Sequence, residues 1–301
     1  MSKAITFSEY GTPEVLRLSE VSTPEPGPGQ VRIRVRAASV NPLDLKVRSG
    51  LMAKVAPARF PVTPGLDAAG VVDAVGEGAD AAVGDEVLGA AAGGSYGEYA
   101  LLDRPAAKPQ GLSWEVAASL VTVGQTAFRV LRELAVRAGQ TLLVHGAAGS
   151  VGTVAVQLAA ARGITVVGTV GEHDIERVTA LGATAVRYGD GWVERVKAAA
   201  PQGVDAVFDA SGAGVLAESV ALAGDSARVV TIADMTAAQH GVRFSAGSAD
   251  PADDSLAQLV RMAAAGELDL PVWRAYPLDQ AAVAHGDLEA RRNRGKVVLL
   301  P

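Results

Sequence analysis

A run of small residues between a strand-like and a helix-like segment carries the clearest chemistry in this sequence. Residues 147–152 read Ala-Ala-Gly-Ser-Val-Gly, which matches the pattern A-x-G-x-x-G, and they follow the apolar residues 141–144. Small residues let the backbone approach a ligand closely, and free N–H groups at a helix start favour negative charge. We therefore predict a binding site for the pyrophosphate of a dinucleotide, formed by Ala147, Gly149, Ser150, Val151 and Gly152.

Strand-like and helix-like segments alternate from this motif onward. Five apolar runs are separated by helical runs, and the motif follows the first strand and opens the first helix. This alternation predicts an α/β fold with a doubly wound parallel sheet, the Rossmann arrangement. An isolated glycine motif is more often a tight turn, but this context favours dinucleotide binding. The predicted strands cover residues 141–146, 164–170, 184–188, 204–211 and 228–234.

The end of the second predicted strand bears on which dinucleotide fits. An NAD enzyme usually has Asp or Glu there to accept hydrogen bonds from ribose hydroxyls, and residues 167–171 contain neither. Thr169 at this strand end, with His173 and Arg177 downstream, favours NADPH. The alternative for His173 and Arg177 is an ordinary solvent-exposed position at the start of a helix. Glu172 and Asp174 argue against NADPH, because an acidic residue would repel its 2′-phosphate.

Two later strand ends supply further candidates, because ligands of open α/β sheets gather at the carboxyl ends of the strands. The fourth predicted strand ends at Ser211, and the fifth ends at Ile232 and Ala233. We predict Ser211 near the adenosine ribose of the cofactor, and Ile232 and Ala233 near its nicotinamide.

The first third of the chain has a different pattern. Gly and Pro turns separate short β-branched runs at residues 31–40 and 69–76, which indicates a β-rich domain. A helix is predicted over 113–135 with Ser113 as its N-cap, so we place the domains at 1–114 and 115–267. Residues 268–301 add a strand, a helix and a strand, and include a basic run ending in Lys296. Residues 245–255 are predicted as a surface loop.

Composition narrows the classes of partner. The chain has 301 residues, a net charge of −6 and no cysteine. The acidic balance disfavours nucleic acid and anionic membranes, and the lack of cysteine excludes disulfides and thiolate metal sites. No apolar run is long enough to span a membrane, and residues 1–11 do not read as a signal peptide. We therefore predict a cytoplasmic protein whose partner is a small molecule.

Six stretches stand in order along most of the chain: AASVNPLDLKVRSG, PGLDAAGVVDAVGEGA, VGDEVLG, VTVGQTAFRVL, VHGAAGSVGTVAVQLA and RGKVVLL. Together they resemble the medium-chain dehydrogenase/reductase superfamily, specifically its zinc-independent quinone oxidoreductase branch. The resemblance implies a GroES-like catalytic domain, formed by residues 1–114 and completed by 268–301, together with a Rossmann domain at 115–267. It also implies a homodimer that pairs the strand segments at 228–234 and 241–247.

Zinc enzymes of this superfamily bind their metal with two cysteines and a histidine. This chain has no cysteine, and where those enzymes read G-H-E it reads Gly65-Leu66-Asp67. Leu66 cannot bind a metal, so we expect no zinc, and we expect a supporting or structural role for Asp67. The resemblance then implies hydride transfer from NADPH to an acceptor that is already electrophilic, either a quinone or an α,β-unsaturated carbonyl.

The resemblance assigns the remaining candidate residues. Asn41, in the stretch Asn41-Pro42-Leu43-Asp44, would donate its amide to the substrate oxygen or the nicotinamide ribose, with Asp44 in support. The alternatives are a turn for Asn41 and a helix cap for Asp44. Arg48 would either reach the substrate or pair with an acidic neighbour. The cofactor side adds Thr126 near the nicotinamide, Tyr188 near the adenine ribose phosphate, and Arg294 at the nicotinamide or a phosphate.

Three functional hypotheses follow. The first is a zinc-independent, NADPH-dependent quinone reductase, and the second is an enoyl or enone reductase on the same scaffold. The third is a non-catalytic NADPH-binding sensor or structural protein. It is motivated by residues 51–54, Leu-Met-Ala-Lys, which lack the tyrosine proton donor that some enoyl reductases of the superfamily have there.

Overall fold

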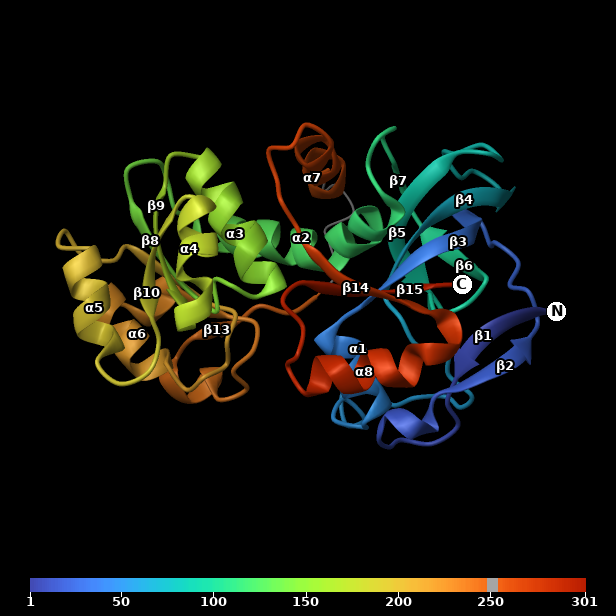
Figure 1. Cartoon of the computed structure of the whole chain (residues 1–301), viewed down its shortest axis with the longest axis horizontal. Helices are drawn as coiled ribbons and strands as arrows, with labels where there is room; N and C mark the ends of the chain where they lie inside the picture. The colour runs from blue at the N-terminus through green and yellow to red at the C-terminus, as the bar shows by residue number, and fades with distance from the viewer. Residues whose placement is uncertain (248–253) are drawn as a thin grey trace. The chain divides into compact units, whose positions relative to one another are not determined.

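The computed structural model of the chain describes residues 1–247 and 254–301. Two compact units are formed, one by Met1–Thr122 with Leu256–Pro301 and one by Val123–Ser255. Helix α2 (Trp114–Leu134) contains the first boundary between them, and the division at 114 and 267 stays a prediction (Figure 1). Ser113 Oγ accepts the N–H of Val116 at 3.2 Å, as predicted for an N-cap. Most of the loop predicted at 245–255 lies outside the described residues.

Unit 2 (Val123–Ser255) contains a six-stranded sheet in which every neighbouring pair is parallel. In order along the chain, the strands stand at positions 3-2-1-4-5-6, which is the Rossmann order, and the prediction of a doubly wound sheet is confirmed. The order reverses between β8 and β11. The strands, in spatial order, are β10 (Ala183–Arg187), β9 (Thr165–Val170), β8 (Thr141–His145), β11 (Ala206–Asp209), β12 (Val229–Thr231) and β13 (Arg243–Phe244).

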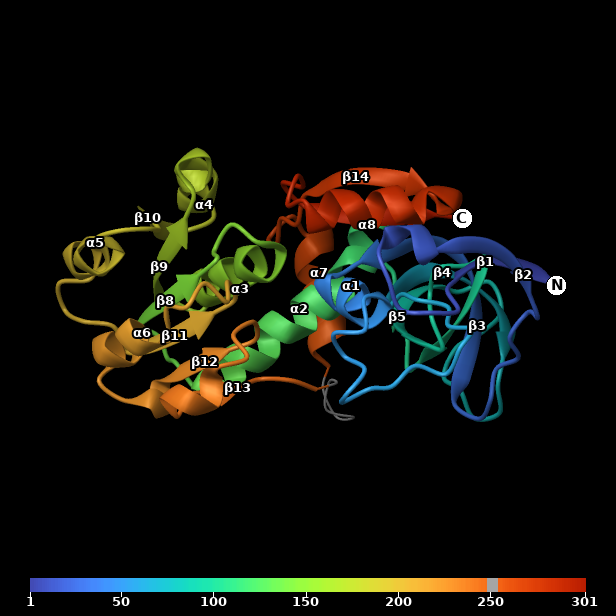
Figure 2. The ribbon, with the colours of Figure 1, turned by 90° about the horizontal axis from the view of Figure 1, so that it is seen from below.

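Helices cover both faces of this sheet. Figures 1 and 2 show α3 (Ser150–Ala161) and α4 (Ile175–Ala180) on one face, with α5 (Trp192–Ala199) and α6 (Leu216–Ala223) on the other. The buried core between them is mainly aliphatic, as the low aromatic content predicts. Short 3₁₀ turns lie at Glu172–Asp174, Ser226–Arg228 and Ala237–His240.

Unit 1 (Met1–Thr122 with Leu256–Pro301) is built on a mostly antiparallel seven-stranded sheet. Its first strand, β3 (Gln30–Val40), pairs with both β4 (Asp67–Val75) and β6 (Tyr99–Asp103), so β3 to β6 close into a barrel. This is the GroES-like part of the predicted fold. The other strands are β5 (Glu86–Ala92), β7 (Ala106–Ala107), β14 (Val272–Pro277) and β15 (Lys296–Leu300), with β1 (Ser2–Thr6) and β2 (Arg17–Val21) as a separate pair.

The C-terminal segment joins this sheet through β15. Strand β15 is parallel to β14 and antiparallel to β3, and α8 (Ala281–Glu289) connects β14 to β15. Val297 pairs with Val40, so the register brings Lys296 next to the start of α1 (Pro42–Arg48). Helix α7 (Ser255–Ala264) precedes this segment, and 3₁₀ turns lie at Pro13–Val15 and Leu278–Gln280.

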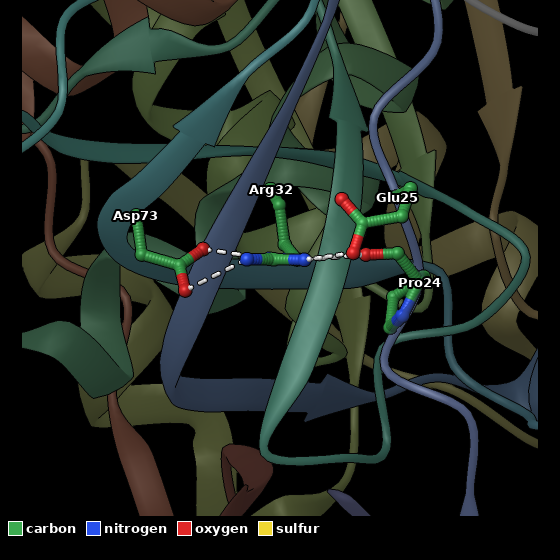
Figure 3. Close-up of polar contacts among 4 residues, drawn as sticks. All are labelled: Pro24, Glu25, Arg32 and Asp73. Atoms are coloured by element: carbon green, nitrogen blue, oxygen red, sulfur yellow. Dashed lines mark hydrogen bonds and ion pairs between the residues drawn. The ribbon is translucent and has the colours of Figure 1, made fainter. Parts of the chain in front are cut away.

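Arg32 ties the outer face of the barrel to the preceding loop. Its guanidinium binds both carboxylate oxygens of Asp73 on β4, at 2.9 and 3.4 Å, and also Glu25 and the carbonyl of Pro24 (Figure 3). The hydrogen bond to Asp73 raises the pKa of Arg32. Bidentate geometry of this kind orients both partners, and it fixes residues 24–25 against β3.

Candidate functional site

Asn41 is fixed in one orientation at the start of α1. Its Nδ2 donates to Asp67 Oδ2 at 2.8 Å, and its Oδ1 accepts from Lys296 Nζ at 2.7 Å. Its backbone N–H donates to Asp44 Oδ2 at 2.7 Å, which is the helix-cap role considered for Asp44. Because a carboxylate faces the NH₂ group and an ammonium faces the carbonyl, a flipped amide would be repelled on both sides.

The charged groups around Asn41 are buried together. Asp44, Asp67 and Lys296 are each no more than 3% exposed. Thr122 donates its backbone N–H and its hydroxyl to Asp67, at 3.3 and 2.5 Å. Lys296 also donates to the carbonyl of Val40 at 3.3 Å. A buried charge needs such partners, since the cost of leaving one unpaired is large.

Burial shifts the pKa values of this cluster. Burial raises the pKa of Asp44 to about 7, with the charge of Asp67 acting in the same direction, while the N–H of Asn41, Tyr96 and Lys296 oppose the rise. The pKa of Asp67 is raised by burial against the opposing effects of Lys296, Thr122 and Asn41. Burial lowers the pKa of Lys296, which the two carboxylates oppose. Asp44 therefore titrates near neutral pH.

A second set of hydrogen bonds connects Asp44 to helix α8. Tyr96 Oη donates to Asp44 at 3.2 Å and lies 3.2 Å from His285 Nε2. Arg48 lies 3.4 Å from His285 Nδ1, donates to the carbonyl of Gly11 and forms an ion pair with Glu289. Arg48 thus pairs with an acidic neighbour, the second of its two sequence-based alternatives. Burial and the Arg48 charge lower the pKa of His285 to about 3, so its ring is neutral.

The glycine loop of unit 2 is built around a close backbone contact. A Cβ added to Gly152 would lie 2.2 Å from the carbonyl oxygen of Gly146, so only glycine fits there. Gly149 is the N-cap of α3 and has no side chain with which to cap the first turn. Ser150, Val151 and Gly152 therefore begin the helix without an acceptor from an N-cap side chain. This arrangement can hold an anion.

Arg177 reaches the glycine loop from α4. Its guanidinium donates to the carbonyl of Ala148 at 2.7 Å and to Thr153 Oγ1 at 3.3 Å, and it pairs with Asp174 at 3.1 Å. The side chain is about one-third exposed, so it lies within reach of solvent and of a ligand. His173 is exposed on the turn before α4.

The ends of β9 and β10 carry the next two candidates. Thr169 is buried, and its hydroxyl lies 3.1 Å from His145 Nδ1. Tyr188 follows β10 and is 64% exposed. A Cβ at Gly171 would lie 3.5 Å from the Tyr188 ring, so this ring stands beside the turn that follows β9. An exposed aromatic ring next to such a turn is free to stack on a ligand.

The loops after β11 and β12 contain Ser211, Ile232 and Ala233, and all three are partly buried. The Ser211 hydroxyl is held by Asp209, at 2.7 Å from Oδ1. A Cβ at Gly146 would lie 3.3 Å from Ser211 Cβ, so the glycine loop and the Ser211 loop touch. The structure thus gathers Ala147, Gly149, Ser150, Val151, Gly152, Thr169, Arg177, Ser211, Ile232 and Ala233 at the carboxyl end of one sheet.

Two further predicted residues belong to other elements. Thr126 is partly buried within α2, and Arg294 is exposed just before β15 in unit 1. Sequence reasoning did not single out Tyr96, His285 or Asp209. Of these, Asp209 carried a readable signal, because it is a charged residue at the end of an apolar strand. In residues 1–247 and 254–301, no helix is long and apolar enough to cross a membrane, and no three His, Asp or Glu side chains are arranged to hold a metal.

Known proteins share both parts of this architecture. Residues 27–112 match the family described as alcohol dehydrogenase GroES-like domain, and residues 181–299 match the family described as zinc-binding dehydrogenase. The quinone oxidoreductase of Lama guanicoe is 33% identical over 324 aligned residues, covering 100% of this chain and 98% of that protein.

Solved structures agree with these matches. The quinone oxidoreductase of Coxiella burnetii superposes with a TM-score of 0.89 at 32% identity, covering 100% of this chain and 99% of that one. The Escherichia coli quinone oxidoreductase complexed with NADPH gives 0.85 at 26% identity, covering 99% and 100%. A GroES-like unit combined with a Rossmann unit defines the architecture of a two-domain dehydrogenase or reductase. The chain belongs to the medium-chain dehydrogenase/reductase superfamily, in its quinone oxidoreductase branch.

Proposed function

We propose that this protein is an NADPH-dependent oxidoreductase that reduces a quinone or a similar activated acceptor without zinc. The observation that carries the proposal is the glycine loop at the head of a 3-2-1-4-5-6 parallel sheet, in a chain that aligns along its whole length with quinone oxidoreductases. One of the similar structures, from Escherichia coli, is complexed with NADPH.

The glycine loop is the proposed site for the pyrophosphate. NADPH, when bound, supplies the hydride. The first-turn N–H groups of α3 and the guanidinium of Arg177 provide positive potential beside Ala148, and this favours a phosphate group over a neutral ligand. Tyr188, His173 and Thr169 are proposed for the ribose side.

Asn41 is the proposed contact to the substrate oxygen. A primary amide has one carbonyl oxygen and two N–H donors. In Asn41 the oxygen accepts from Lys296 and one N–H donates to Asp67. Its second N–H is the group we propose to stabilise negative charge that develops on an acceptor oxygen. Asp67 and Lys296 hold the side-chain amide in place, and Asp44 accepts the backbone N–H of Asn41. The contacts of Arg48 support a positioning role for that residue.

Zinc independence rests on the donor set. Leu66 stands where zinc enzymes of the superfamily have histidine, and the chain has no cysteine. The family description that matches residues 181–299 refers to zinc, so this point needs a direct test. We also propose a homodimer, because β13 is an edge strand of the six-stranded sheet. Light scattering of the purified protein checks this, and a mass near 30.6 kDa would contradict it.

NADPH oxidation at 340 nm tests the proposed activity. Chelator-treated protein is assayed against a panel of small quinones and 2-enones, with NADH in parallel. We expect turnover that survives chelation, fastest with a quinone and with NADPH. Loss of turnover on chelation, restored by zinc, would overturn the zinc-free proposal. Preference for enones would favour the enone reductase hypothesis, and NADPH binding with no turnover would favour the sensor hypothesis.

Arg177→Gln tests the assigned cofactor side. We expect KM for NADPH to rise about tenfold, since a charged hydrogen bond contributes about 1.5–3 kcal/mol. Arg137→Gln is the matched control and should leave KM unchanged. Arg137 precedes β8, so it lies toward the amino ends of the strands, whereas the glycine loop follows the carboxyl end. Equal KM values for NADPH in the two variants would contradict the assignment of Arg177 to the cofactor site.

A further inference from the structure

Four buried polar residues form one row across the carboxyl ends of four adjacent strands. Thr169 on β9, His145 on β8, Asp209 on β11 and Thr231 on β12 are in register with one another. In-register neighbours of a parallel sheet project toward the same face. The preceding row is apolar, with Gly168, Val144, Phe208 and Val230. The polar row therefore spans the position between β8 and β11 where the strand order reverses.

Asp209 binds the loop that follows its own strand. Its Oδ1 accepts from the backbone N–H of Ser211 at 2.9 Å, from the Ser211 hydroxyl at 2.7 Å and from the N–H of Gly212 at 3.1 Å. An ionised carboxylate is the side chain that can accept this many donors at once without presenting one of its own. Three bonds on one oxygen leave the other oxygen for the neighbouring strand.

The second oxygen connects Asp209 to the next loop. Thr231 Oγ1 donates to Asp209 Oδ2 at 2.7 Å. A hydroxyl has a single hydrogen, so toward its other neighbours Thr231 can only accept. It accepts the N–H groups of Ala233 at 3.1 Å and Asp234 at 3.0 Å. Through Thr231, one carboxylate thus determines the conformation of both loops.

These bonds turn the N–H groups of both loops inward. Ile232 donates its N–H to the carbonyl of Asp209, and Ala210 donates to that of His145. The loops also touch each other, since a Cβ on Gly212 would lie 3.0 Å from Ala233. The N–H groups of residues 210–212 and 232–234 are therefore occupied by bonds within the protein.

His145 supports the row without adding a charge. Ser219 Oγ donates to the carbonyl of Val215 at 2.6 Å, so it must accept from His145 Nε2, which lies 3.1 Å away. His145 Nδ1 then accepts from the Thr169 hydroxyl. Burial lowers the pKa of His145 to about 4, against the opposing charge of Asp209. The neutral ring leaves the Asp209 carboxylate as the charged member of the row.

We propose that Asp209 is a positioning residue of the cofactor site, which sets the backbone of residues 211–212 and 233–234 through its own bonds and through Thr231. The proposal rests on the proposed function in that these loops are the ones assigned to NADPH. Asp209 itself need not touch the cofactor, because its four bonds are all to the protein.

The experiment compares Asp209→Asn, Thr231→Val and Thr231→Ser with Asp205→Asn. Asp205 lies at the opposite end of β11, where its carboxylate accepts one backbone N–H, from Thr141 at 2.8 Å. It is therefore a matched control for losing a charge on this strand. Amide hydrogen exchange is measured on each protein without ligand, and NADPH affinity is measured by fluorescence.

We expect Asp209→Asn to speed exchange at residues 211, 212, 233 and 234 at least tenfold and to raise the Kd for NADPH about tenfold, which is about 1.4 kcal/mol. Thr231→Val should speed exchange at 233 and 234 while sparing 211 and 212. Thr231→Ser keeps the hydroxyl and should stay within about twofold of the wild type in both measurements, given the typical spread of such bonds. Asp205→Asn should leave both loops and the affinity unchanged.

Wild-type exchange and affinity in Asp209→Asn, or in Thr231→Val if the first variant does not fold, would overturn the proposal. Equal losses in Asp205→Asn would also overturn it, because the effect would then be general destabilisation. If the wild type itself does not bind NADPH, the proposed function fails. The exchange data still decide whether Asp209 sets the two loops.

Discussion

Replacing Asp44 by Asn should remove the pH dependence of unfolding that this buried carboxyl group contributes. Asp44 is buried, and its pKa is raised from 3.8 to about 7, chiefly by burial. The folded chain therefore keeps this proton up to about pH 7, whereas the unfolded chain releases it near pH 4. Because the folded state binds more protons in this window, its stability must fall as the pH rises.

The magnitude follows from the shift. One pKa unit corresponds to about 1.4 kcal/mol, and Asp44 is half ionised at pH 7, so the loss between pH 5 and pH 7 amounts to about 2 kcal/mol. In Asp44→Asn the side chain is neutral at every pH and keeps an oxygen for the N–H of Asn41. The variant should match the wild type near pH 4 to 5 and exceed its stability at pH 8.

Urea unfolding at pH 5, 6, 7 and 8, followed by far-UV circular dichroism, measures this difference. His285 is neutral throughout the window, since its pKa is about 3. Asp80→Asn, at an exposed loop position, is the control that removes a carboxyl without this burial. If Asp44→Asn and the wild type lose equal free energy between pH 5 and pH 8, the reasoning is refuted.

Four further substitutions test other contacts. Lys296→Met leaves the buried carboxylates without their cation and should cost about 3–5 kcal/mol of unfolding free energy in the same urea assay; a loss below 1 kcal/mol would contradict this. Gly152→Ala should cost about 3 kcal/mol or more, since its Cβ would meet a carbonyl oxygen at 2.2 Å. Gly149→Ala, with 3.3 Å to the same atom, should fold normally and bind NADPH more weakly by fluorescence. Arg48→Met should lower the melting temperature with little change in kcat, whereas a large kcat loss in folded protein would restore a catalytic role.

The Rossmann sheet and its glycine loop could be predicted because their signals are local. Periodicity assigns each strand and helix, and the motif at 147–152 lies within six residues. The cluster around Asn41 could not be predicted in this way. Asn41 and Lys296 are 255 positions apart, and only the register of β15 against β3 brings them together.

The basic run before β15 shows the same limit. The sequence groups Lys296 with Arg291, Arg292 and Arg294, but Lys296 is 3% exposed and the three arginines are exposed. Charge patterning describes a segment as a whole, whereas the side on which each residue lies depends on strand pairing. His285 and Tyr96 were missed for a related reason, since isolated residues of these types are usually just part of a core.

The position of β15 has a consequence for biosynthesis. This strand lies between β14 and β3 in its sheet, so the seven-stranded sheet of unit 1 stays incomplete until residues 296–300 have emerged from the ribosome. Residues 123–255 are translated before that point and make their sheet contacts among themselves. Domains generally fold as units during synthesis, so we expect the inserted unit to fold first. Until Lys296 arrives, Asp44 and Asp67 lack their buried cation, and nascent chains that stall before residue 296 are expected to depend on chaperones.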